Sequence, residues 1–512
     1  MTDKITGQGR SVLEALARRA MAERGFWPDF SQNAISELEN IPKIKPESPR
    51  DLRHLPWASI DNPESRDLDQ LTAAEPRRDG VIRILVAVAD VDVLVKKDSA
   101  IDAHARHNTT SVYTAGGTFP MLPEKLSTDL TSLNLNQDRA AVVVDMVVDG
   151  EGKITDSKIY TSTVRNHARL NYDAVAAWLE GQEPSPGREA VAREILDNLR
   201  LQERAAQALR ARRVERGALE LETLETRPVF EDGNIRDLKD DEPNRATRII
   251  EDFMIAANDA TATFLRRNRA PSLRRVVRVP TRWDRIVEIA SRRGFRLPPQ
   301  PDSRALSEFL IRQKAADPLR FPDLSLTIVK LLGSGEYVVE LPDEKAPGHF
   351  GLAVKDYMHS TAPNRRFPDL VTQRILKAIL DGRRPPYSRE ELFELARHCT
   401  EQEDDASKIT RLVEKSAAAM LLSTRIGDVF DALCTGINDT GTWVRIFHPP
   451  VEGKLLKGYE GLDVGDQLKV WLINTDIEAG FIDFERVSDT PEHMIKARRK
   501  KRVQNDKAKN VS

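Results

Sequence analysis

The chain has 512 residues, with 78 lysines and arginines, 80 aspartates and glutamates, and a formal net charge of −2. This length suggests about three or four domains, and the near-neutral charge neither predicts nor excludes a polyanionic partner. No apolar run reaches the roughly 18 residues that a membrane-spanning helix needs. The polar N-terminus has no apolar signal sequence, and two cysteines cannot form a zinc cluster or a disulfide scaffold. We therefore expect a cytoplasmic protein without membrane contact.

Residues 1–55 are expected to form a small helical module. Leu13, Leu16 and Ala20 recur at helical spacing, and Ser31 is a candidate cap for a second helix. Two short helices around a turn fit a helix-turn-helix or winged-helix fragment. A plain helical extension that packs on the next domain is an alternative of about equal weight.

Residues 56–425 are expected to form one large α+β domain. Two apolar runs, at 81–88 and 140–148, are typical of buried strands. Helical periodicity then dominates, and strands followed by helices indicate the α+β class. The predicted helices span 189–213, 245–266, 372–380, 390–398 and 407–423.

The C-terminal part changes character again. Residues 426–487 contain five short strand-like segments separated by Gly, Asn and Asp turns, which is the size of an OB-fold barrel. Residues 488–512 are strongly basic and lack apolar periodicity, so they predict a flexible tail that binds phosphates without sequence preference.

The segment SIDNPESRDLDQL places three acids close together: Asp61, Asp67 and Asp69. Two carboxylates about 4 Å apart repel by roughly 4 kcal/mol at an effective dielectric constant of 20. A divalent cation removes that cost, and oxygen ligands with retained waters suit Mg²⁺, with Mn²⁺ as a substitute. A solvated acidic loop is the alternative, while calcium is less suitable because the spacing of an EF-hand is missing.

Two arginine-rich clusters are candidates for phosphate binding, because guanidinium groups bind phosphate in a bidentate way. An ion-pair network or a solvated face is the alternative for each of them. The first cluster consists of Arg266, Arg267, Arg269, Arg274, Arg275 and Arg278. The second is the segment YMHSTAPNRRFPD, which contains His359, Arg365 and Arg366.

Seven motifs occur in one order along most of the chain, and together they resemble the ribonuclease II / ribonuclease R (RNB) family of 3′-to-5′ exoribonucleases. The motifs are SIDNPESRDLDQL, VAVADVDVLVKKDSAIDAHA, TSVYTAGGTFPMLPEKLSTDL, RRVERGALEL, EDFMIAANDATA, PSLRRVVRVP and YMHSTAPNRRFPDLV. The C-terminal barrel is similar to the ribosomal S-one-type RNA-binding domain of that family. The resemblance implies a central catalytic domain flanked by the helical module and the barrel.

The resemblance also implies roles for single residues. Asp61, Asp67 and Asp69 match the acids of the Mg²⁺ centre, and Asp69 matches the acid whose loss stops cleavage. Arg365 matches the arginine at the scissile phosphate. Tyr113 matches an aromatic residue that stacks on the RNA 3′ end. The remaining RNA-binding candidates are Arg275, His359 and Arg366.

The sequence departs from the family pattern in two places. The family's acidic motif usually ends in paired aspartates, but Asp69 is followed by Gln70, which brings no charge as a fourth ligand. The family also usually carries two cold-shock domains, for which residues 1–55 are too few. RNA must therefore reach the catalytic domain by a differently built route.

The expected function is a processive, sequence-nonspecific, Mg²⁺-dependent exoribonuclease that releases nucleoside 5′-monophosphates. Its partners would be single-stranded RNA 3′ ends and structured RNA with a 3′ overhang, and we expect a monomer. An RNA-binding protein without catalysis is an alternative that Gln70 favours. A metal-dependent phosphodiesterase for small molecules is a second alternative, against which the barrel and the basic tail argue.

Overall fold

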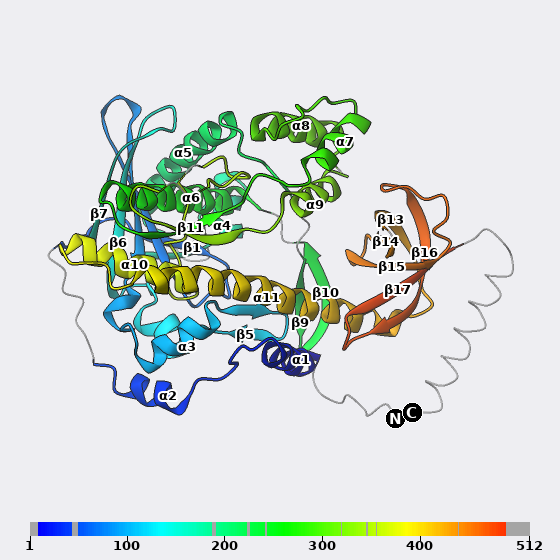
Figure 1. The fold of residues 1–512 in the computed structure, drawn as a ribbon, viewed down its shortest axis with the longest axis horizontal. Helices are drawn as coiled ribbons and strands as arrows, with labels where there is room; N and C mark the ends of the chain where they lie inside the picture. Colours follow the sequence, from blue (N-terminus) through cyan, green and yellow to red (C-terminus); the bar gives the residue numbers. More distant parts are fainter. Residues whose placement is uncertain are drawn as a thin grey trace.

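The computed structural model describes residues 9–42, 50–186, 191–222, 226–240, 243–318, 320–344, 347–354, 356–438 and 440–487. Within them a central α+β domain carries two N-terminal helices on one side and a C-terminal barrel at one end (Figure 1). This confirms the multidomain α+β class. The basic tail lies outside the described residues. In the described part of the chain, no helix has the length and apolarity that crossing a membrane requires.

A six-stranded sheet forms the centre of the large domain. Its strand order is β7-β6-β3-β2-β1-β8, and all neighbours are antiparallel except β1 and β8. The central strand β3 is almost entirely buried, which explains its continuous apolar run and confirms that prediction. The strands span Ala58–Asp61 (β1), Gln70–Pro76 (β2), Ile82–Ala89 (β3), Asp138–Val148 (β6), Ile154–Arg165 (β7) and Ala168–Asn171 (β8).

Helices bury the sheet. Helices α5 and α6 pack across β2, β3 and β6, and one continuous apolar core joins the sheet to these helices, to α10 and to α11 (Arg389–Leu422). Three further helices, α7 to α9, form a separate small core. The helices span Ala100–Asn108 (α3), Tyr172–Leu179 (α4), Arg193–Glu215 (α5), Arg245–Arg267 (α6), Trp283–Arg292 (α7), Ser303–Ala316 (α8), Phe321–Leu332 (α9) and Phe367–Leu380 (α10).

Three two-stranded ribbons complete the domain: β4 with β5, β9 with β10, and β11 with β12. Their strands span Val112–Thr114 (β4), Gly117–Phe119 (β5), Thr226–Glu231 (β9), Asn234–Asp240 (β10), Ser272–Val276 (β11) and Glu336–Glu340 (β12).

The predicted helices at 390–398 and 407–423 are a single helix, α11, which spans Arg389–Leu422. A capping box between Ser388 and Glu391 starts it. The acidic segment between the two predicted helices contains no Gly or Pro, and its buried residues Gln402 and Ala406 continue the apolar stripe. The prediction of two helices was wrong because the exposed acids of that segment, Glu401 and Asp404, belong to the solvent side of a continuous helix, whose other side buries Gln402 and Ala406.

The two N-terminal helices are α1, Gly9–Glu23, and α2, Gln32–Glu39. Helix α1 packs on α11 and shares an apolar cluster with it, whereas α2 packs on α3. Ser31 caps α2, as the sequence predicts. This is the arrangement of a helical extension rather than of a helix-turn-helix pair.

The C-terminal strands close into a five-stranded barrel in the order β13-β14-β15-β17-β16, which confirms the OB-fold prediction. Its core includes Leu422 at the end of α11. A buried ion pair from Arg445 to Asp323 of α9, at 2.6 Å, fixes its other side. The strands span Val429–Asn438 (β13), Gly441–Ile446 (β14), Val451–Lys457 (β15), Gln467–Asp476 (β16) and Phe481–Arg486 (β17).

The segment between α1 and α2 is held by aromatic rings on α3. Trp27 stacks on the imidazole of His107 with ring centroids 3.7 Å apart, and Phe30 lies 4.1 Å from His104. The side chain of Asn108 adds two hydrogen bonds to this contact. It accepts from the backbone N–H of Trp27 and donates to the backbone carbonyl of Trp27. Because His104 is only 2% exposed, burial lowers its pKa to about 4.

This buried imidazole predicts a pH-dependent stability. An unfolded histidine has a pKa of about 6.5, so folding favours the neutral His104. The stability that this contributes is complete above pH 6.5 and is lost as the pH falls toward 4. At pH 5 the loss should be roughly 2 kcal/mol. Urea unfolding at pH 7 and pH 5 measures it, and His104→Gln should shrink the difference by that amount. The exposed His54 provides the control, since His54→Gln should leave the pH difference unchanged.

Candidate active site

The predicted acidic segment forms the loop between β1 and β2. Strand β1 ends at Asp61 and β2 begins at Gln70. Leu68 anchors the loop in the core, where its backbone is hydrogen-bonded on both sides to residues 132–133. Asp61 stabilises the turn that follows β1, because its Oδ1 accepts from the N–H of Asn62 at 2.8 Å and from the hydroxyl of Ser65 at 2.7 Å. The loop is therefore an ordered part of the domain and not a solvated acidic stretch.

Asp69 meets the second predicted cluster. Its Oδ2 accepts from Nε of Arg365 at 2.8 Å, and its Oδ1 accepts from the backbone N–H of Asn364 at 3.1 Å. The carboxylate is 2% exposed, whereas the side chain of Arg365 is 39% exposed. Nε is the only guanidinium nitrogen with a partner among the described residues, so the two terminal nitrogens of Arg365 are available to an anion.

Tyr113 of β4 lies beside the same acids. Its hydroxyl donates to Oδ2 of Asp67 at 2.6 Å, and 42% of the residue is exposed. Thr410 of α11 holds the strand by donating to the backbone carbonyl of Tyr113 at 3.0 Å. The structure therefore brings together four predicted site residues, Asp67, Asp69, Tyr113 and Arg365.

Burial dominates the electrostatics of the acids. It raises the pKa of Asp69 to about 7; Arg365 opposes this rise, and the charge of Asp67 adds to it. Burial also raises the pKa of Asp61, against the hydrogen bonds from Ser65 and Asn62. The single guanidinium thus compensates the carboxylates only in part.

The chemistry of these donors fits a divalent cation. Asp61 Oδ2 and Asp67 Oδ1 accept no hydrogen bond from the described residues, so each of these carboxylates has one oxygen left for a further ligand. A hard cation would also relieve the repulsion that raises the pKa of Asp69. Across the described ranges, however, no three acidic, His or Cys side chains are already gathered as metal ligands. Gln70 is the first residue of β2 and pairs with Val88 of β3. Its side chain makes no hydrogen bond to the acids.

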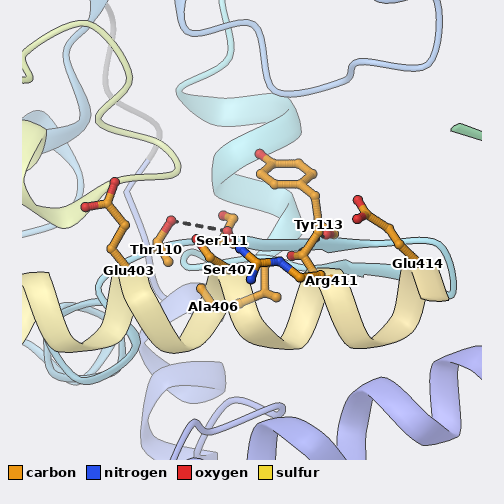
Figure 2. A pocket seen from close by; sticks show the side chains of 10 residues that line it. Thr110, Ser111, Tyr113, Glu403, Ala406, Ser407, Arg411 and Glu414 are labelled. Carbon is orange, nitrogen blue, oxygen red and sulfur yellow. Dashed lines mark hydrogen bonds between the residues drawn. The ribbon is translucent and has the colours of Figure 1, made fainter. Parts of the chain in front are cut away.

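A cavity of about 420 Å³ continues from Tyr113 along α11. Figure 2 shows the phenol ring standing above the helix, with Glu403 at one end, Glu414 at the other and the side chain of Arg411 between them. An open site with an aromatic ring on its wall suits a flat molecule that is recognised by stacking on the ring rather than by hydrogen bonds.

The other predicted RNA-binding residues lie behind this site. Arg275 pairs with Glu403 at 2.9 Å, and its guanidinium lies over the ring of Tyr337 at 5.1 Å. His359 exchanges a 2.7 Å hydrogen bond with the hydroxyl of Tyr337. Neither side chain is therefore presented to solvent like Arg365.

The first arginine cluster is mainly an ion-pair network, which was the alternative reading of its sequence. Arg274 is 1% exposed and pairs with Glu340 at 2.5 Å, and Arg266 pairs with Asp356 at 2.8 Å. These arginines pair with acidic residues from distant parts of the chain. The local sequence does not show such partners.

The sequence did not predict two residues that help to build the site, although both lie inside the motif YMHSTAPNRRFPDLV. Asn364 contributes its backbone N–H to Asp69, and no side-chain pattern announces such a role. Asp369 is fully buried, where it accepts from the N–H of Ala362 at 2.8 Å and from Arg366 at 2.7 Å. It therefore shapes the loop that presents Arg365. Its position three residues after Arg366, in the first turn of a helix, was the available signal.

Two family models match the chain. The RNB domain matches residues 49–382. The RNase II-type exonuclease C-terminal S1 domain matches residues 428–487.

Several curated proteins are similar over most of the chain. Ribonuclease R of Escherichia coli is 30% identical over 542 residues, which cover 98% of this chain and 65% of that protein. Ribonuclease R of Vibrio parahaemolyticus is 32% identical over 504 residues, which cover 90% of this chain and 59% of that protein. The chain thus spans less than two thirds of the length of either relative.

Solved structures share the fold. Mycoplasma genitalium RNase R in complex with ribose-methylated single-stranded RNA matches with a TM-score of 0.82 at 24% identity, over 93% of this chain and 78% of that chain. The same protein with double-stranded RNA matches with a TM-score of 0.82 at 23% identity, over 93% and 83%. A yeast protein described as a pseudonuclease matches with a TM-score of 0.66 at 17% identity, over 86% and 55%. Because a pseudonuclease shares the fold, catalysis has to be argued from the side chains.

The buried pair of Arg366 and Asp369 predicts a large effect on stability. Asp369→Ala leaves the guanidinium of Arg366 without its carboxylate, and breaking a buried pair in this way costs about 3–5 kcal/mol. Urea unfolding of both proteins at pH 7 measures the loss. The exposed pair of Arg383 and Asp381, at 2.7 Å, provides the control, because Asp381→Ala should cost less than about 1 kcal/mol. Equal losses in the two variants would contradict the shaping role of Asp369.

Proposed function

The chain belongs to the RNB domain family, and on that premise we propose that it is a processive, sequence-nonspecific 3′-to-5′ exoribonuclease that hydrolyses RNA with Mg²⁺ and releases nucleoside 5′-monophosphates. One observation carries the proposal: the buried carboxylate of Asp69 holds Nε of the half-exposed Arg365, beside Asp67 and Tyr113. The fold alone would not suffice, since a pseudonuclease shares it.

Each residue of the site has a part in the proposed hydrolysis. Asp61, Asp67 and Asp69 would hold Mg²⁺, which supplies charge neutralisation and an activated water when bound. The free nitrogens of Arg365 donate to the phosphate and stabilise the charge that develops on its oxygens. Water forms the new bond to phosphorus and gives up a proton, the bond from phosphorus to the bridging 3′ oxygen breaks, and that oxygen takes up a proton and leaves as the 3′ hydroxyl of the shortened RNA. The 5′-phosphate therefore stays on the released nucleotide.

Tyr113 suits an enzyme that degrades any sequence. Stacking on an aromatic ring contributes about 1–3 kcal/mol per base and tolerates every base. The ring stands at the open cavity along α11, next to the acids. We propose that the 3′-terminal base stacks there.

RNA is the proposed partner for two reasons. The barrel has the fold of an oligonucleotide-binding domain, and it is fixed to α11 and α9 next to the catalytic domain. Mycoplasma genitalium RNase R, which shares the fold, has been solved with single-stranded and double-stranded RNA. We propose single-stranded 3′ ends as the substrate, including those that overhang a duplex. The two free, buried cysteines suit a reducing cytoplasm.

An RNA-binding protein without catalysis is the second candidate. The neutral Gln70 at the acidic motif is the observation that favours it. Incubation of 5′-labelled single-stranded RNA with Mg²⁺ separates the two functions. A short labelled end product with few intermediates, absent in EDTA, is expected of the enzyme, and intact RNA under all conditions would establish the binding protein.

Asp69→Asn should abolish cleavage while RNA binding survives. Asn keeps the size of the side chain but removes the charge that holds the metal, whereas binding rests on arginines, stacking and the barrel. Turnover and RNA affinity are measured on the same preparation. Residual activity within about tenfold of the wild type, which is only about 1.4 kcal/mol of the barrier, would exclude Asp69 from catalysis.

Gln70→Asp should lower the Mg²⁺ concentration that gives half-maximal rate. Mg²⁺ usually takes one or two carboxylates together with waters and substrate phosphates, so three aspartates can hold it without a fourth. An added carboxylate should strengthen binding before RNA arrives. A Mg²⁺ titration of both proteins on one RNA decides this, and an unchanged midpoint would place residue 70 out of reach of the metal.

A further inference from the structure

A second large cavity, of about 670 Å³, lies at the other end of the central sheet from the acids. Helices α5 and α6 and the turn between β6 and β7 line it. Gln70, next to the acids, pairs with Val88, whereas the opposite end of β3, Ile82, pairs with Val148 just before the turn. Six residues of strand separate the two ends, which is roughly 20 Å. The cavity is therefore distinct from the proposed active site.

The cavity has an excess of positive charge. Two of its three acids are already paired, since Asp252 forms a short ion pair with Arg213 and Asp356 pairs with Arg266 at 2.8 Å. Only Asp259 remains among the acids. Three further cations line the same space, and none is in an ion pair with a described residue: Lys153, Arg212 and Arg216.

Buried N–H groups in this wall lack acceptors. Nε of Arg212 and Nε of Arg213 are buried, and no described residue accepts a hydrogen bond from either. A guanidinium cannot lose its proton to avoid this cost, and buried donors in native proteins are almost always satisfied. The two orphaned donors show that this wall is short of acceptors, which adds to its excess of positive charge.

The rest of the wall is apolar and fixed. Gly152 presses the β6–β7 turn onto α5 so closely that a Cβ there would lie 2.0 Å from the carbonyl oxygen of Ala208. This side of the cavity is therefore held against α5, and the volume of the cavity is in the range that small ligands occupy. Its apolar lining consists of Ile154, Leu209, Ile255, Ala256, Ala353 and Val354.

We propose that this cavity binds a phosphate monoester with an apolar body, of the class of the nucleoside 5′-monophosphates, with the phosphate on Arg212, Arg216 and Lys153. Guanidinium groups match phosphate in a bidentate way. The apolar wall takes the base, and Asp259 accepts from a hydroxyl or amino group of the ligand. A simple inorganic anion would leave the apolar wall without a partner.

Calorimetry on the full chain tests this proposal. The background is Arg365→Ala in EDTA, which removes phosphate binding at the proposed active site. Adenosine 5′-monophosphate should bind one to one, and adenosine or inorganic phosphate alone should bind at least tenfold more weakly. Arg212→Ala and Arg216→Ala should each weaken binding of the monophosphate at least tenfold. Arg216 is exposed, so its substitution does not threaten the fold.

Arg204→Ala is the matched control, because Arg204 is an exposed residue of the same helix outside the cavity. It should leave the affinity unchanged. Absence of saturable binding, or binding that survives both cavity variants, would overturn the proposal. Phosphate as tight as the monophosphate would leave an adventitious ion only. The measurement is one of binding in EDTA, so its outcome is independent of whether the chain degrades RNA.

Discussion

The ion pair between Asp69 and Arg365 joins two segments that are 296 residues apart in the sequence. The carboxylate is buried, and a buried charge without a partner is costly. The guanidinium offsets this cost only in part, since the pKa of Asp69 remains raised to about 7 by burial. Both segments must therefore be held by the fold itself. Leu68 fixes one of them in the core, and Asp369 fixes the other through Ala362.

Helix α11 connects this pair to the rest of the molecule. It runs the length of the central domain and ends at the barrel (Figure 1). Along the way Thr410 holds the strand of Tyr113, and Glu403 pairs with Arg275 behind the site. At its end Leu422 enters the core of the barrel. The aromatic ring beside the acids and the barrel thus have one continuous helix as a common support, which suits a substrate long enough to touch both.

The sequence was sufficient for features that depend on local pattern. The apolar runs of β3 and β6, the five strands of the barrel and the three clustered aspartates were all predictable from periodicity and spacing. The interactions that assemble the site were less predictable, because they join segments that are distant in the sequence. The backbone of Asn364 and the pairing of Arg274 with Glu340 have no local signature. The continuous helix α11 was missed for a related reason: the acidic residues in its middle interrupt the apolar pattern, and only the packing shows that Gln402 and Ala406 are buried.

The net charge of the site explains why a neutral residue at position 70 matters. When all three carboxylates are ionised, Asp61, Asp67 and Asp69 against Arg365 leave two negative charges, which one divalent cation would neutralise. An approaching phosphate would then meet a site without net repulsion, with the terminal nitrogens of Arg365 free to receive it. A fourth carboxylate at position 70 would leave a further negative charge, which favours a second cation before RNA can bind. On the proposed function, the neutral amide therefore favours a site that takes one metal ion and relies on the RNA phosphate to complete its shell.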